Sequence, residues 1–182
     1  MFDYDTPVEF DIPETGYEIA SGTTEDGTDW SLKIIAGNVK SASGSSAVRN
    51  NCVSLVTLAQ FGADKLLLTG DATTETLAFL QKKQAAQIKN LVYFQVPHHG
   101  SAGSEPSMAF LKNVNPESII ISVGLLNDSY NLPRASIVET WLACSRLQKK
   151  KWVIDYWTRE EDKKWSYLNR VVEDVWKAEG YE

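Results

Sequence analysis

The chain has 182 residues, of which 43% are hydrophobic, and a formal net charge of −6 at neutral pH. The hydrophobic fraction excludes a disordered protein, and the length suits one domain with a substantial core better than two independent domains. The acidic balance argues against nucleic-acid binding through charge alone, although it is compatible with a phosphate substrate held by a metal ion.

Cysteine usage and hydropathy bear on the cellular compartment. Cys52 and Cys144 both lie in apolar runs, which favours buried free thiols over a disulfide. The sequence shows no leader-like N-terminus and no apolar run of membrane-spanning length. We therefore expect a soluble, cytoplasmic protein without a membrane partner.

The predicted elements alternate strands with helices, after an acidic lead-in at residues 1–30 that Gly, Thr and Pro punctuate. In chain order, strands are expected at 17–20, 31–36, 52–61, 65–70, 91–96, 118–123, 151–158 and 164–168. Helices are expected after Asp71, after a Ser104 cap, from Pro133 to Leu147, and from 169 to 177. Short turns join 52–61 to 65–70, and 151–158 to 164–168, as hairpins.

The side chains in these elements indicate how they pack. Thr73 or Thr74 can cap the first helix, and in the second helix we expect Met108 and Leu111 to point inward. The strands are continuous apolar runs, which is typical of a sheet that is covered on both faces. The chain therefore reads as a single α/β domain with its regular core at 31–182, built as a layered sandwich of sheet and helices.

Polar residues follow three of the expected strands. Asp71 follows the strand expected at 65–70, the adjacent His98 and His99 follow the strand at 91–96, and Asn127 follows the strand at 118–123. Open α/β sheets place their ligand sites along the edge formed by the carboxyl ends of the strands. These four side chains, although distant in sequence, are therefore expected to converge.

The converging residue types suggest metal chemistry. Asp71 and the neutral imidazoles of His98 and His99 are suitable ligands for zinc or manganese, and the metal would activate a water molecule. Ser101 and Asn127 are candidates for substrate binding. Plainer alternatives are that Asp71 only caps a helix, that the two histidines are merely exposed, and that Asn127 is a turn residue.

A family resemblance covers about residues 50 to 135. It is carried by NNCVSLVTLAQFGADKLLLTGDATTETLAFL, LVYFQVPHHGSAGS and FLKNVNPESIIISVGLLNDSYNLP, in that order. These segments resemble the C-terminal half of metallo-β-lactamase-fold hydrolases, especially the ComEC-like competence-protein branch. The resemblance implies one half of an αββα sandwich, a catalytic metal site with Asp71 as a bridging ligand, and a further ligand from His98 or His99.

The sequence also departs from this family. The family's His-x-His-x-Asp-His signature is absent, and Leu132 precedes Pro133 where the family tends to have histidine. We therefore expect a fragment or subunit that is inactive alone. A missing N-terminal half or a partner chain would complete it as a hydrolase. Its expected substrates are phosphoesters. The alternative is a degenerate, non-catalytic module for assembly or ligand binding, which would use its uncovered face to form a homodimer or bind a partner.

Overall fold

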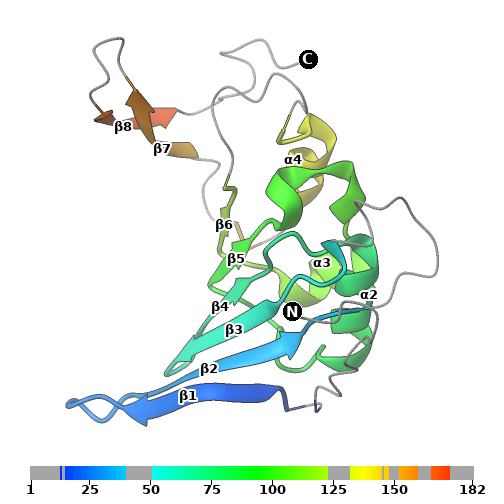
Figure 1. The fold of residues 1–182 in the computed structure, drawn as a ribbon, viewed down its shortest axis with the longest axis vertical. Coiled ribbons are helices and arrows are strands. Elements are labelled where there is room, and N and C mark those ends of the chain that lie inside the picture. The colour runs from blue at the N-terminus through cyan, green and yellow to red at the C-terminus, as the bar shows by residue number, and fades with distance from the viewer. Residues whose placement is uncertain are drawn as a thin grey trace, which may run out of the picture.

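The computed structural model describes residues 13, 15–39, 51–122, 132–144 and 146–147, and the backbone of two further strands at 152–159 and 165–172. Its main element is a six-stranded sheet in the order β1-β2-β3-β4-β5-β6 (Figure 1). The strands are β1 Tyr17–Thr23, β2 Asp29–Ala36, β3 Val56–Phe61, β4 Asp64–Leu68, β5 Tyr93–Gln95 and β6 Ser118–Ile120. The α/β fold class predicted from the sequence is thus confirmed.

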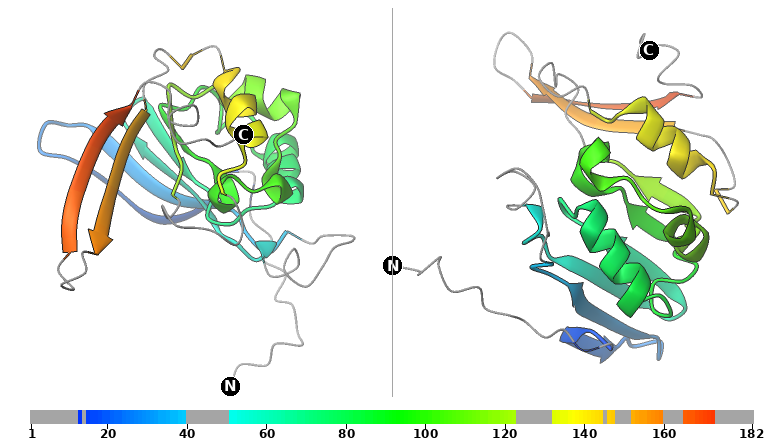
Figure 2. Two further views of the ribbon diagram at one scale, coloured as in Figure 1. Left: turned by 90° about the horizontal axis from the view of Figure 1, so that it is seen from above. Right: turned by 90° about the vertical axis from the view of Figure 1, so that its right-hand side faces the viewer.

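Helices lie against one face of this sheet, as the two views of Figure 2 show. They are α2 Thr74–Lys83, α3 Met108–Val114 and α4 Ala135–Leu142, with short 3₁₀ turns η1 Pro97–Gly100 and η2 Ala102–Ser104. A separate antiparallel hairpin is formed by β7 Trp152–Arg159 and β8 Trp165–Val172. No helix in the described part of the chain is long and apolar enough to cross a membrane.

The pairing of the strands determines where their ends lie. Each of the strands β1 to β4 runs antiparallel to its neighbour, whereas β4, β5 and β6 run parallel to one another. Helix α2 connects β4 to β5, and α3 connects β5 to β6. Because these three strands are parallel, their carboxyl ends meet at one edge of the sheet, and the loops that follow them gather there.

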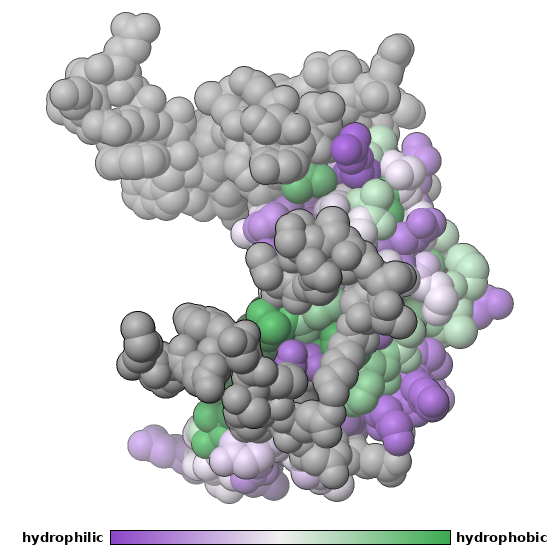
Figure 3. Space-filling model, turned by 45° about the vertical axis from the view of Figure 1, so that its right-hand side comes forward, coloured by the Kyte–Doolittle hydropathy of each residue, from purple (hydrophilic) through white to green (hydrophobic). Residues whose placement is uncertain are grey.

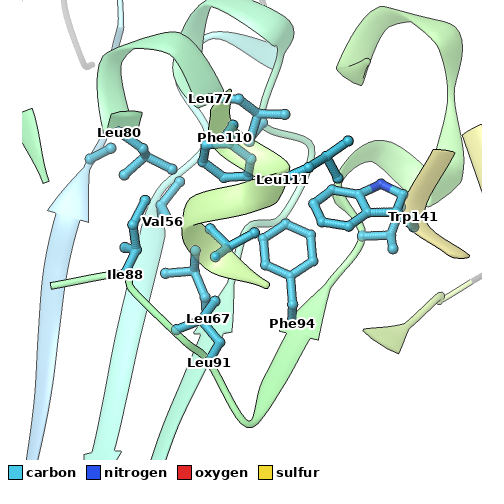
Figure 4. Packing of buried hydrophobic residues seen from close by; sticks show 14 of the residues in the cluster. Val56, Leu67, Leu77, Leu80, Ile88, Leu91, Phe94, Phe110, Leu111 and Trp141 are labelled. Carbon is cyan, nitrogen blue, oxygen red and sulfur yellow. The ribbon is translucent and has the colours of Figure 1, made fainter. Parts of the chain in front are cut away.

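The core lies between the sheet and the helices (Figure 4). Phe94 of β5 stacks on Trp141 of α4 with ring centroids 4.3 Å apart, and Phe110 of α3 meets both rings edge-on. All three rings are fully buried. Leu77 and Leu80 of α2 complete this layer, because their spacing of three residues places both on one face of the helix.

The opposite face of the sheet is exposed, which corrects the prediction of a sheet covered on both faces. Trp30, Phe61 and Tyr93 point to this side and are 37%, 51% and 47% exposed. Together with Leu32, Ala59 and Leu66 they line a shallow groove of about 520 Å³. Continuous apolar strands predict burial of both faces only when the chain supplies a second covering layer.

The predicted start of one strand and that of one helix were wrong, because local hydrogen bonds override the apolar pattern. Cys52 belongs to a turn rather than to β3, since the Ser54 amide donates to the Asn51 carbonyl at 3.1 Å. The cap of α3 is Ser107, whose hydroxyl accepts from the Phe110 amide, and not Ser104. This later start leaves Met108 60% exposed instead of inward.

Two helix predictions at the C-terminal side were also wrong. Helix α4 ends at Leu142 rather than Leu147, because Arg146 is held by Glu117 and by the Asn115 side chain instead of continuing the helix. Residues 169–172 form the end of β8, where Asn169 pairs with Asp155, so the helix predicted at 169–177 does not start there. Short apolar spacings do not by themselves separate strand from helix.

Candidate functional site

The turn after β4 presents Asp71 at the carboxyl edge of the sheet. Gly70 adopts a left-handed conformation with φ of +54°, and the Asp71 amide donates to the Ser54 hydroxyl at 3.2 Å. The side chain of Asp71 remains 43% exposed. Helix α2 has Thr73 as its N-cap residue, so Asp71 does not occupy the capping position that its alternative interpretation required.

The turn after β5 holds both histidines in an unusual backbone conformation. His98, His99 and Gly100 have φ values of +50°, +56° and +78°. A left-handed non-glycine residue costs about 1–3 kcal/mol and persists only where surrounding contacts enforce it, often at functional sites. Here the His98 amide donates to the Gly70 carbonyl at 3.0 Å, and the Ser101 amide to the His98 carbonyl at 2.9 Å.

This backbone directs the His99 imidazole toward Asp71. Its Nε2 atom lies 3.5 Å from Asp71 Oδ1. Its Nδ1 atom contacts the backbone carbonyl of Ser122, just after β6. Because a carbonyl only accepts hydrogen bonds, Nδ1 carries a proton, and in the neutral ring the lone pair of Nε2 faces the carboxylate.

A proton on Nε2 would join the two groups as an ion pair, and a metal cation bound by both would satisfy the same two atoms. Zinc binds imidazole nitrogen and carboxylate oxygen at roughly 2.0–2.2 Å in tetrahedral geometry, so two such ligands lie about 3.4 Å apart. The 3.5 Å separation of His99 Nε2 and Asp71 Oδ1 is compatible with this ligand spacing and equally with a direct ion pair. The contact of Nδ1 with a carbonyl is also the usual outer support of a metal-binding histidine.

His98 points elsewhere. Its Nε2 atom lies 3.1 Å from the Asn51 side-chain amide, and its ring centroid is 6.4 Å from that of His99. Of the two candidate ligands, His99 is thus the one whose imidazole lies at Asp71. The side chain of His99 is 47% exposed, in keeping with the plainer alternative for that residue, although each imidazole has a specific partner.

Of the two predicted substrate-binding residues, the structure describes only Ser101. Ser101 is the N-cap of η2, where its hydroxyl accepts from the Gly103 amide at 3.3 Å. Its predicted contact with substrate stays a prediction. Asn127 lies outside the described residues.

Sequence reasoning missed the residues that support the site. Ser54 and Gln95 bind the amides of the turn that carries Asp71, Ser122 supplies the carbonyl to His99, and Asn51 holds His98. All four lie within the segments that carry the family resemblance, but the motifs in those segments indicated no role for them. Roles of this kind depend on backbone groups across the sheet, which leave no spacing signal in the sequence.

Across the parts of the chain described by the structure, no group of three or more His, Cys, Asp or Glu side chains is placed to hold a metal ion. Cys52 and Cys144 are buried free thiols, as expected. A scan against models of known protein families matches none of them, and a search of curated proteins finds no relative.

Proposed function

We propose that this chain contributes part of a divalent metal site, with Asp71 and His99 as ligands, to a hydrolase of the metallo-β-lactamase type. The observation that carries the proposal is the 3.5 Å approach of His99 Nε2 to Asp71 Oδ1, with the other ring nitrogen anchored on Ser122. Zinc is the preferred ion for this donor pair, and manganese is the alternative. The left-handed backbone at His99 supports the same assignment.

A bound metal would lower the pKa of a water molecule and polarise a phosphoryl oxygen, which suits phosphoester hydrolysis. The residues of this chain would bind the metal and orient its ligands. Asp71 offers its carboxylate from the β4 turn, and His99 is fixed in one tautomer by Ser122. Ser101, the N-cap residue of η2, is half-buried and is our candidate for substrate contact.

The site is incomplete within the described residues. A catalytic zinc site usually has three protein ligands and one open position, whereas Asp71 and His99 supply two. In our proposal the remaining ligands come from another polypeptide segment or a partner chain that carries the His-x-His-x-Asp-His motif. The exposed apolar face of the sheet supports this arrangement, because a second layer packed there would remove Trp30, Phe61 and Tyr93 from water.

Metal binding to the whole purified chain tests the proposal. Isothermal titration with Zn²⁺ and Mn²⁺ is expected to detect one weak site, without substantial phosphodiesterase activity. Asp71→Asn is expected to weaken Zn²⁺ binding at least about tenfold, because it removes a charged ligand. Asp64→Asn, at an exposed position in the β3–β4 hairpin, is the matched control and is expected to bind normally. Equal binding by wild type and Asp71→Asn would contradict the proposal.

A second function is favoured by the same exposed face. As a non-catalytic module, the chain would use the groove between Trp30, Phe61 and Tyr93 to assemble with a second copy or with another protein. By contrast, the helical side in Figure 3 shows hydrophilic residues interspersed with small hydrophobic patches. Zinc binding that depends on Asp71 favours the hydrolase proposal, and self-association of a chain that binds no metal favours assembly.

A further inference from the structure

The turn that carries Asp71 is held to the neighbouring strand β5 by side-chain hydrogen bonds. The register between β4 and β5 ends with the pairs Leu66–Tyr93 and Leu67–Phe94. Beyond it, Gln95 Oε1 accepts from the Thr69 amide at 3.0 Å and from the Gly70 amide at 3.4 Å. The side chain of Gln95 thus satisfies two amide groups that the strand pairing leaves free.

Thr69 in turn forms a hydrogen bond to the backbone of Gln95. Its hydroxyl donates to the Gln95 carbonyl at 2.9 Å, and Thr69 itself is fully buried. Each of the two residues therefore binds the backbone of the other through its side chain. A reciprocal pair of this kind fixes the position of one chain relative to the other more firmly than a single bond does.

The same connection reaches the histidine loop. Gln95 lies three residues before His98, whose amide donates to the Gly70 carbonyl at 3.0 Å. Gly70 is therefore held by Gln95 on one side and by His98 on the other, immediately before Asp71. The link from Asp71 to His99 runs through the Gly70–His98 hydrogen bond, and Gln95 holds the Thr69–Gly70 end of that link.

We propose that Gln95 is a positioning residue that sets the separation of Asp71 and His99, and with it the metal affinity of the site. This inference rests on the proposed function of Asp71 and His99. Gln95 itself touches neither side chain among the contacts observed. It acts through the Thr69–Gly70 backbone, one step further from the metal than a group that binds a ligand directly, the loss of which typically lowers metal affinity about 10–100-fold.

Substitutions of Gln95 separate this role from a general contribution to stability. Gln95→Met keeps the length of the side chain but removes the acceptor, and is expected to weaken Zn²⁺ binding about tenfold or more. Gln95→Glu keeps an acceptor oxygen and is expected to retain the affinity. The matched control is Gln60→Met on β3, which loses one hydrogen bond to the Gly62 carbonyl at an exposed site. Thermal unfolding of each variant reports the loss of stability separately.

A metal-free measurement makes the test independent of the proposed function. The imidazole NMR signals of His99, assigned with His98→Gln, are expected to shift strongly in Asp71→Asn, and much less so when Gln95→Met is already present. If wild type binds no Zn²⁺ but this difference is seen, the positioning role stands and the metal proposal fails. If wild type and Gln95→Met bind Zn²⁺ equally and show equal NMR responses, the positioning role is wrong. Should Gln95→Met fail to fold, Thr69→Val, which removes the hydroxyl of the reciprocal pair, takes its place with the same expected and contradicting results.

Discussion

The adjacent imidazoles of His98 and His99 have different partners: His99 Nε2 lies 3.5 Å from Asp71 Oδ1, whereas His98 Nε2 lies 3.1 Å from the Asn51 amide. We therefore predict that His99→Gln abolishes or strongly weakens Zn²⁺ binding, while His98→Gln, one residue away in the same left-handed turn, retains most of it. Equilibrium dialysis with both variants measures this. The assignment of His99 fails if His98→Gln alone loses the metal.

Gly100 allows the histidine loop to pack against the segment before α4. A Cβ atom at Gly100 would lie 2.7 Å from Pro133 Cβ, and its φ is +78°. We predict that Gly100→Ala destabilises the protein by about 2–4 kcal/mol, from the left-handed conformation and the steric overlap together. Gly27→Ala, with φ of +83° and no neighbour within 4 Å, should cost only about 1–2 kcal/mol. Urea unfolding compares the two, and similar losses would argue against close packing at Gly100.

The Trp141 indole fills the centre of the core but leaves one polar atom unsatisfied. Its Nε1 is buried and has no hydrogen-bond partner among the described residues, while its ring stacks on Phe94. We predict that Trp141→Ala costs about 3–5 kcal/mol. Trp141→Phe should remain within about 1 kcal/mol of wild type, because removal of the unpaired N–H offsets the lost volume. A loss in Trp141→Phe as large as that in Trp141→Ala, measured by denaturant unfolding, would contradict this offset between the unpaired N–H and the lost volume.

The Cys144 thiol should make stability depend on alkaline pH. Burial raises the pKa of Cys144 from 9.0 to about 11. In the unfolded chain the thiol ionises from about pH 9 upward, so between pH 9 and 11 the unfolded state holds fewer protons than the folded state. Stability contributed by this group is therefore full below pH 9 and decreases as the pH rises toward 11.

The difference between wild type and Cys144→Ala isolates this effect from other groups that titrate in the same range. The stability curves of the two proteins should converge from pH 9 to 11 when measured by urea unfolding. Parallel curves would contradict the shifted pKa of Cys144.

The exposed face of the sheet should drive association. We predict that Phe61→Ser, on this face, lowers concentration-dependent self-association and the binding of an apolar fluorescent dye. Met108→Ser is the control, because Met108 is 60% exposed but lies on α3, on the helical side. Analytical ultracentrifugation measures association of each variant. Equal behaviour of the two variants would mean that exposed apolar area alone, and not this face, is responsible.

Much of the fold follows from local sequence pattern. The hairpin of β3 and β4, the strand at β2 and the helix α2 after Asp71 agree with expectation because turn residues and apolar periodicity act over only a few positions. The location of Asp71, His98 and His99 at one edge also follows, since parallel strands align their carboxyl ends. Element ends were less predictable: Arg146 leaves the path of α4 for partners far away in the sequence.

The sequence by itself determined which residue types could bind a metal and that they would share an edge of the sheet. Only the tertiary structure distinguished His99 from His98, because that choice depends on a left-handed backbone and on the Ser122 carbonyl from another strand end. It also revealed Gln95 and left one sheet face exposed. Periodicity and capping are local properties of the chain. Hydrogen bonds between strands and the cover of a face are decided by groups that only folding brings together.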